Sequence, residues 1–230
     1  MDFDFDKILF GISVWLLPVL IAITFHEAAH GFIALRCGDD TALRAGRVTF
    51  NPFKHIDRFG TIIIPALLLL FKSPFLFGYA KPVPVNFGRL NHPRRDMVWV
   101  ALAGPGINLI LAIVSALLLH LLHYMPESVG YWALKNLRNS IQINVILAVF
   151  NMLPIPPLDG GRVAVGLLPD VLAYPLARLE HWGMFIIIGG VFILPLIGRQ
   201  LGIDLNIFSW LVGGPVDYLI KVILKLTGLI

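Results

Sequence analysis

Residues 8 to about 35 form an apolar run that contains two histidines and a glutamate, in the sequence TFHEAAHGF at residues 24–32. Placing each such ionisable group inside a bilayer costs roughly 2–3 kcal/mol of free energy, so these groups are typically found there only where they have a function. His26 and His30 are four residues apart, so on a helix their imidazoles lie one turn apart on the same face. This spacing is typical of a zinc site in which the intervening Glu27 acts as general base on a metal-activated water. The run is therefore predicted to be a helix that binds a catalytic metal.

The composition indicates a polytopic membrane protein. The 230 residues are 57% hydrophobic and 14% charged, with a mean hydropathy of +0.82, whereas a soluble domain carries about 25% charged residues. The net charge of +4 is spread over the loops without a basic stripe, so we expect no nucleic-acid partner. Cys37 is the only cysteine, which excludes an intrachain disulfide and a thiolate metal cluster.

The hydropathy pattern predicts an all-α membrane protein with about five to six transmembrane or re-entrant segments around a three-helix catalytic core. The apolar segments after the first are expected at residues 59–71, 97–124, 141–153, 182–197 and 207–226. The segment at 59–71 is short and contains a proline, so it either spans the bilayer or re-enters it. We expect a single domain over residues 1–230, with a catalytic core at about 8–168 and C-terminal helices at about 180–227.

Residues 78–87, with the sequence GYAKPVPVNF, differ from the helical segments. Val83 and Val85 alternate with Pro82 and Pro84, and proline fits neither a helix interior nor a central strand. We expect a short extended, β-like segment with a free edge. Such an edge could pair with an unwound substrate through main-chain hydrogen bonds, with Val83 and Val85 as tentative substrate-binding residues. The alternative is a purely structural loop.

Two histidines need a third protein ligand to form a zinc site. No glutamate lies between His30 and Glu127, which argues against the glutamate ligand of many soluble HExxH enzymes. The aspartates of the polar loop after the first helix are expected to be solvated: Asp39, Asp40 and Asp57. Asp159 is different because it lies between a proline cluster and a glycine pair, in PIPPLDGG. Irregular backbone at membrane depth is tolerated where it lines a polar cavity, so Asp159 is the predicted third ligand.

Simpler interpretations of these residues remain open. The HExxH pattern could arise by chance and serve interhelical hydrogen bonds, and Asp159 alone could cap a helix N-terminus. Asn108, in the middle of an apolar helix, is expected to form an interhelical hydrogen bond rather than to contact substrate.

Three motifs together resemble the site-2 protease family of intramembrane zinc metalloproteases. They are HEAAH at residues 26–30, AGPGIN at 103–108 and NMLPIPPLDGGR at 151–162. GRVTFNPFKHID and GYAKPVPVN also resemble a bacterial branch of that family. The resemblance covers residues 24–162 and implies a short bacterial-type member without a PDZ or CBS domain.

The resemblance also implies a set of roles. One Zn²⁺ ion would be held by His26, His30 and Asp159, with Glu27 as the catalytic acid/base and Asn151 as a tentative substrate-binding residue. The implied partner is a single-span transmembrane substrate, such as an anti-sigma factor, in the bacterial inner membrane. The lysine and arginine distribution predicts an outside N-terminus and an active site nearer the cytoplasmic side. The sequence predicts no particular oligomeric state.

Two other functions fit the sequence less well. A transporter or channel whose HExxH binds the transported cation would show polar positions in several helices or an internal repeat, and the sequence has neither. A catalytically inactive, membrane-binding relative would be expected to have lost part of the set formed by His26, Glu27, His30 and Asp159, which is intact.

Overall fold

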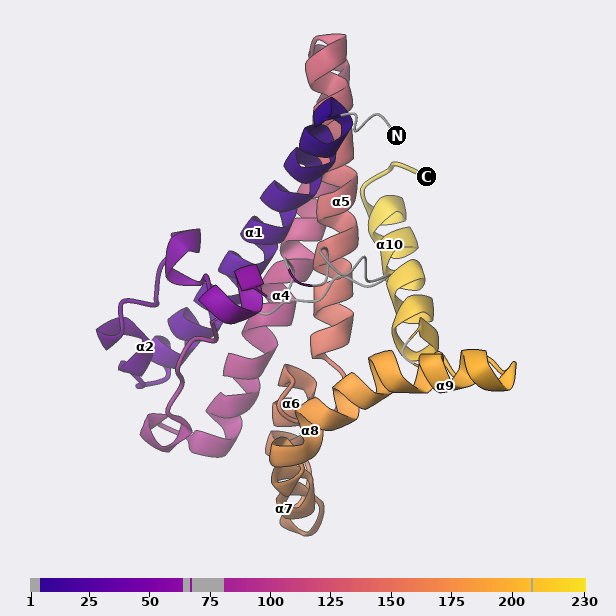
Figure 1. Cartoon of the computed structure of the whole chain (residues 1–230). Coiled ribbons are helices and arrows are strands. Elements are labelled where there is room, and N and C mark those ends of the chain that lie inside the picture. The colour runs from indigo at the N-terminus through magenta and orange to yellow at the C-terminus, as the bar shows by residue number, and fades with distance from the viewer. Residues whose placement is uncertain (1–4, 64–66, 68–80, 208) are drawn as a thin grey trace.

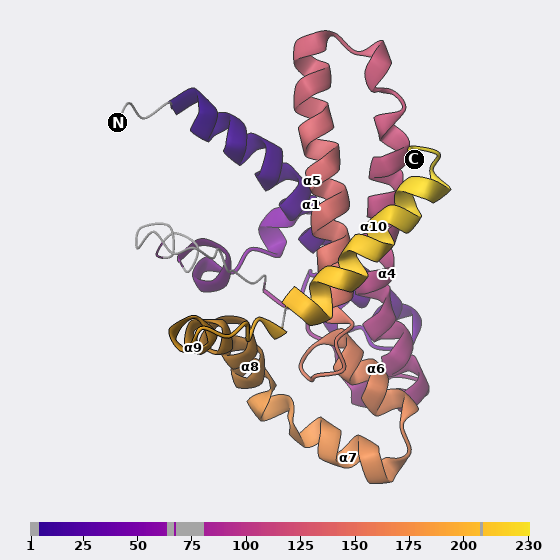
Figure 2. The ribbon, with the colours of Figure 1, turned by 90° about the vertical axis from the view of Figure 1, so that its right-hand side faces the viewer.

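The computed structural model describes residues 5–63, 67, 81–207 and 209–230, and its architecture is all-helical (Figure 1). No strand occurs in these described ranges. The three longest helices pack against one another: α1 (Phe5–Arg36), α4 (Pro93–Leu119) and α5 (Glu127–Asn151). Helices α4 and α5 form a long antiparallel hairpin, and α10 (Gly214–Leu226) crosses it obliquely (Figure 2).

The shorter elements connect and flank this bundle. They are α2 (Thr41–Arg44), η1 (Pro52–Lys54), η2 (Arg58–Ile63), η3 (Phe87–Arg89), η4 (Leu122–Tyr124), α6 (Asp159–Leu167), α7 (Asp170–Arg178), α8 (Glu180–Ile188), η5 (Gly189–Ile193), α9 (Leu194–Leu201) and η6 (Ser209–Gly213). Helices α6 and α7 extend the lower end of the bundle in both views, whereas α8 and α9 run crosswise to it (Figures 1 and 2).

Small residues let the long helices approach closely. On α4, Ala112 and Ala116 are fully buried against Ile141 and Val145 of α5, and α10 closes this cluster with Val216. Alanine at a helix contact allows the backbones to approach, which is how helices associate where lipid removes the hydrophobic driving force.

Three of the described helical segments are long and apolar enough to cross a bilayer: Leu9–Arg36, Pro93–Leu119 and Glu180–Leu201. Their outward faces carry large exposed apolar side chains, such as Ile12 on α1 and Leu117 on α4. These features fit a membrane protein, in which lipid covers such faces.

The helix boundaries correct two expectations. Helix α5 begins at Glu127, well before the predicted start at 141, and α4 ends at Leu119 rather than at 124. The early part of α5 was missed because Lys135 and Arg138 lower its hydropathy, although neither residue opposes helix formation.

Two other expectations fall partly outside the described residues. Of the apolar stretch at 59–71, the structure describes η2 up to Ile63 and residue 67, so its path through or into the bilayer is not among the described features. Residues 81–86 have no regular secondary structure and pair with no strand in the described chain. The β-like edge therefore stays a prediction.

The expectation that Asp39 is solvated is wrong. Its side chain is fully buried, accepts hydrogen bonds from the Thr41 amide and hydroxyl at 3.0 and 2.5 Å, and accepts a third from the Asn86 amide at 2.6 Å. Asp39 therefore joins the loop after α1 to the segment that precedes η3.

Candidate metal centre

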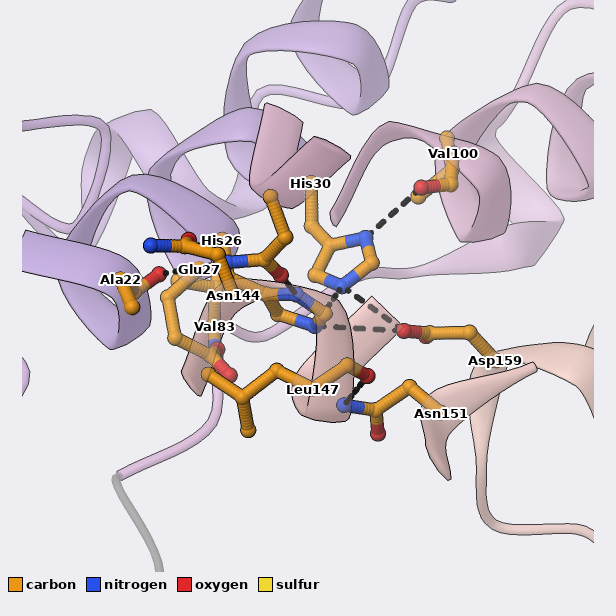
Figure 3. A network of polar contacts seen from close by, with 11 residues as sticks. Ala22, His26, Glu27, His30, Val83, Val100, Asn144, Leu147, Asn151 and Asp159 are labelled. Carbon is orange, nitrogen blue, oxygen red and sulfur yellow. Dashed lines mark hydrogen bonds and ion pairs between the residues drawn. The ribbon is translucent and has the colours of Figure 1, made fainter. Parts of the chain in front are cut away.

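Three buried side chains from two distant parts of the chain meet at one point (Figure 3). His26 and His30 project from the same face of α1, and their Nε2 atoms lie 3.1 Å apart. Asp159, the first residue of α6, places its Oδ2 atom 3.2 Å from Nε2 of His26 and 3.4 Å from Nε2 of His30. The predicted ligand set is therefore brought together in space.

Hydrogen bonds at the far side of each imidazole fix its tautomer. Nδ1 of His30 lies 2.7 Å from the carbonyl oxygen of Val100, and Nδ1 of His26 lies 2.6 Å from Oδ1 of Asn108. The amide of Asn108 is oriented because its Nδ2 donates to Ala22 O and to Asn144 Oδ1. Since both acceptors are oxygens without a proton, each Nδ1 carries the hydrogen and each Nε2 keeps a lone pair.

The Asp159 carboxylate is also arranged to bind a cation. Its Oδ2 atom is buried and accepts no hydrogen bond from any residue that the structure describes, although both Nε2 atoms are near. A buried anionic oxygen without a partner is costly. Two lone pairs and one anionic oxygen thus face each other without a proton between them, and a cation would bind to all three.

The dimensions fit zinc. Tetrahedral zinc with bonds of about 2.0–2.1 Å separates its ligand atoms by about 3.3–3.4 Å. The three measured separations of 3.1, 3.2 and 3.4 Å agree with that value. Two imidazoles and one carboxylate form a donor set typical of catalytic zinc, which keeps a fourth position open.

Gly104 on α4 leaves room for the ion. A Cβ atom at this position would lie 2.5 Å from Nε2 of His30 and 2.6 Å from Nε2 of His26. Any larger residue would therefore occupy the space between the two ligand atoms. The missing side chain makes the metal site possible.

The turn before α6 positions Asp159. Gly160 and Gly161 pack so tightly on the preceding backbone that a Cβ would overlap Met152 O at the first position and Pro156 N at the second. The other end of α6 is held by Arg94 of α4, whose guanidinium donates to the carbonyls of Gly166 and Leu168.

Arg94 also pairs with Asp170 of α7 at 2.7 Å. Helix α6 is therefore fixed at both ends, and so is the carboxylate it carries.

The remaining predicted residues are placed as follows. Glu27 is half-buried next to His26, and its Oε2 accepts a hydrogen bond of 2.7 Å from the Val83 amide. Asn151 lies at the end of α5, where its Nδ2 donates to Leu147 O at 3.0 Å (Figure 3). Val85 packs on a separate apolar cluster between α1 and α4.

Sequence reasoning missed part of this arrangement. The interhelical hydrogen bond expected of Asn108 is confirmed, but its contact with His26 was not foreseen. The place of Gly104 beside the two imidazoles was not foreseen either. Its place in the motif AGPGIN was the available signal, but the face of α4 that meets the histidines depends on the tertiary fold.

Comparison with known proteins gives consistent results. The family model of Peptidase family M50 matches residues 14–142 and 128–195. Similar proteins include three that are named "Putative zinc metalloprotease". YwhC of Bacillus subtilis is 39% identical over 184 residues, which cover 78% of this chain and 80% of YwhC.

Rip2 of Mycolicibacterium smegmatis is 31% identical over 183 residues, covering 78% of this chain and 66% of Rip2. MJ0611 of Methanocaldococcus jannaschii is 32% identical over 204 residues, covering 86% of this chain and 83% of MJ0611. No solved structure matches the chain.

Proposed function

This chain belongs to peptidase family M50, the site-2 protease family, and on that basis we propose that it is an intramembrane zinc endopeptidase. It hydrolyses peptide bonds in or near the transmembrane segments of other membrane proteins, as in regulated intramembrane proteolysis. The observation that carries this proposal is the meeting of the His26, His30 and Asp159 ligand atoms beside Glu27.

Each residue of the site has a part in the reaction. His26, His30 and Asp159 hold the zinc ion, which supplies Lewis-acid polarisation of the peptide carbonyl and of water when it is bound. Glu27 takes a proton from the attacking water and returns it to the leaving amine nitrogen. The Asn108 and Val100 oxygens keep both imidazoles in the ligating tautomer.

The substrate must be unwound near the cleaved bond, because a helix shields its carbonyls with its own hydrogen bonds. The segment at residues 81–86 lies beside Glu27, and an extended substrate would contact it at Val83 and Val85. Asn151, near Asp159 in Figure 3, is the further substrate contact. The substrate class is a single-span membrane protein, such as an anti-sigma factor.

The wider arrangement follows from the same proposal. The chain forms one membrane-embedded domain of five to six transmembrane or re-entrant segments, with its catalytic core at about 8–168 and C-terminal helices at about 180–227. It lies in a bacterial inner membrane with the active site nearer the cytoplasmic side, as the lysine and arginine distribution favours.

Coexpression with candidate single-span substrates tests the activity. Glu27→Gln keeps the size of the side chain but removes its basicity, so wild type is expected to cleave a substrate that this variant leaves intact. Asp159→Ala is expected to abolish both cleavage and zinc retention in the purified protein. Equal processing by wild type and Glu27→Gln would refute the proposed chemistry.

A further inference from the structure

The carboxylate of Glu27 is bound on one side only. Its Oε2 atom accepts the Val83 amide hydrogen at 2.7 Å, and no residue that the structure describes donates to its Oε1 atom. Val83 is 56 residues away in sequence, so a separate segment of the chain fixes the orientation of this side chain. With Oε2 held by the Val83 amide, the Oε1 atom is the oxygen of Glu27 that can take up a proton and release it again.

The segment that carries Val83 is anchored at both ends. At its start, the Lys81 amide donates to His55 O at 3.0 Å, and the Lys81 carbonyl accepts from the Arg47 guanidinium. At its end, the Asn86 amide donates to Asp39 at 2.6 Å. Lys81 and Asn86 are thus tied to the loop that follows α1, which also carries Arg47 and Asp39.

Gly31 seats Val83 against α1. Gly31 lies one helical turn after Glu27, and a Cβ at this position would lie 3.3 Å from Cγ1 of Val83 and 3.2 Å from Cγ2 of Val48. These separations are tighter than ordinary van der Waals contact, so a side chain at residue 31 would press on both Val48 and Val83 and shift them by a few tenths of an ångström. The buried Val83 side chain fills this space, and the Val83 amide consequently lies within reach of Glu27.

We propose that the Val83 amide, seated by Gly31, is a positioning group for the catalytic carboxylate of Glu27. This inference rests on the proposed peptidase function. It adds that the segment at residues 81–86 sets the rate of proton transfer as well as lying beside the substrate. The Val83 amide donates to Oε2 and restricts rotation of the Glu27 side chain, which leaves Oε1 free to take and return the proton. The segment therefore acts through Glu27, and none of the hydrogen bonds found among the described residues joins it to His26, His30 or Asp159.

The test removes one hydrogen-bond donor. Val83→Pro deletes the amide hydrogen and puts the proline ring in its place, so Glu27 loses both the hydrogen bond and the position that the bond gives it. The backbone can accept this change, because Pro84 already confines residue 83 to extended conformations. Val83→Ala is the matched control, since it shortens the side chain but keeps the amide. In the purified full-length chain, acting on the single-span substrate found by coexpression, Val83→Pro is expected to lower kcat roughly tenfold to a hundredfold relative to Val83→Ala, with little change in KM.

Two further measurements separate positioning from general damage. Val83→Pro is expected to retain the same zinc content as wild type, because none of the metal ligands contacts Val83 through a hydrogen bond. Glu27→Asp is too short to reach the Val83 amide, so adding Val83→Pro to Glu27→Asp should cost little further activity. Strict additivity of the two changes would contradict a shared role.

A second variant keeps the proposal testable if Val83→Pro does not fold. Gly31→Ala should displace Val83 and lower kcat, and Val83→Ala in the same chain should restore part of the loss. Gly11→Ala, on the same helix with open space around its Cβ, is the control. Equal kcat for Val83→Pro and Val83→Ala, with Glu27→Gln inactive, would overturn the positioning role while the peptidase function stands. Activity in Glu27→Gln would instead overturn the function itself.

Discussion

Nδ1 of His26 lies 2.6 Å from Oδ1 of Asn108, a hydrogen bond that joins the metal-binding face of α1 to the middle of α4. Asn108 is fully buried and donates in turn to Asn144 of α5, so one polar chain crosses all three long helices. The candidate metal centre is thus connected to contacts that join the three long helices of the bundle.

Replacement of Asn108 should weaken zinc binding. Asn108→Leu removes the acceptor that fixes the His26 tautomer, and we expect a loss of roughly tenfold to a hundredfold in zinc affinity. Competition with a chelator of known affinity measures the change. Asn136→Leu is the control, because Asn136 is also a buried asparagine but, among the described residues, its side chain donates only to Trp132 O in its own helix. If both variants bind zinc like wild type, Asn108 does not orient the ligand.

A single methyl group at Gly104 should abolish zinc binding. The Cβ of Gly104→Ala would lie 2.5 Å from Nε2 of His30, in the space that the ion needs. Gly106→Ala, two residues along the same helix, would meet no atom within 4 Å and should bind zinc normally. Zinc content of the two purified variants decides the matter, and full occupancy in Gly104→Ala would show that the ion binds elsewhere.

Loss of the Arg94 contacts should loosen α6. Arg94→Gln removes donors to the carbonyls of Gly166 and Leu168, so Asp159 would be held less firmly and zinc affinity should fall several-fold. Arg95→Gln is the matched change, since the Arg95 side chain contacts only its neighbour Asp96 among the described residues. A similar zinc affinity in both variants would mean that α6 needs no support from α4.

The three candidate metal ligands could be predicted from the sequence, but the residues that surround them could not. His26, His30 and Asp159 could be predicted because ionisable groups are costly in apolar segments and therefore indicate function. The positions of Asn108 and Gly104 relative to the histidines depend on which faces of α1 and α4 meet, and hydrophobic periodicity is weak in helices that are apolar all round.

Polarity misled the prediction at two places for the same reason. Asp39 was expected to be solvated because it lies in a charged loop, yet its side chain is buried and accepts three hydrogen bonds. The first half of α5 was left out because Lys135 and Arg138 lower its hydropathy. Asp39 can be buried because it accepts a hydrogen bond from Asn86, a residue distant in sequence. Lys135 and Arg138 fit a long helix that has a polar side. Composition alone reveals neither arrangement.

The lowered pKa of Asp39 predicts that the free energy of unfolding depends on pH. Burial raises the pKa of its carboxyl, but hydrogen bonds from Thr41 and Asn86 and the charge of Arg89 outweigh burial, so the pKa lies below its ordinary value. A lowered pKa stabilises the fold above the unfolded-state value of about 3.9, and this contribution is lost as the pH falls through the folded-state pKa.

The expected result is constant stability of this loop from pH 7 to 5 and a decline below about pH 4. Asp39→Asn should lose about 1–3 kcal/mol at pH 7 and show a smaller decline in acid. Thermal unfolding of both proteins in detergent between pH 3 and 7 measures this difference. Parallel pH profiles for the two proteins would exclude Asp39 as the source.

The most direct test of the metal centre is X-ray absorption at the zinc edge of the purified protein. We predict one zinc ion per chain with two imidazole nitrogens and carboxylate or water oxygens at about 2.0–2.1 Å, and the loss of this signal in Asp159→Ala. A sulfur ligand at about 2.3 Å from Cys37, or an unchanged spectrum in Asp159→Ala, would contradict the site formed by His26, His30 and Asp159.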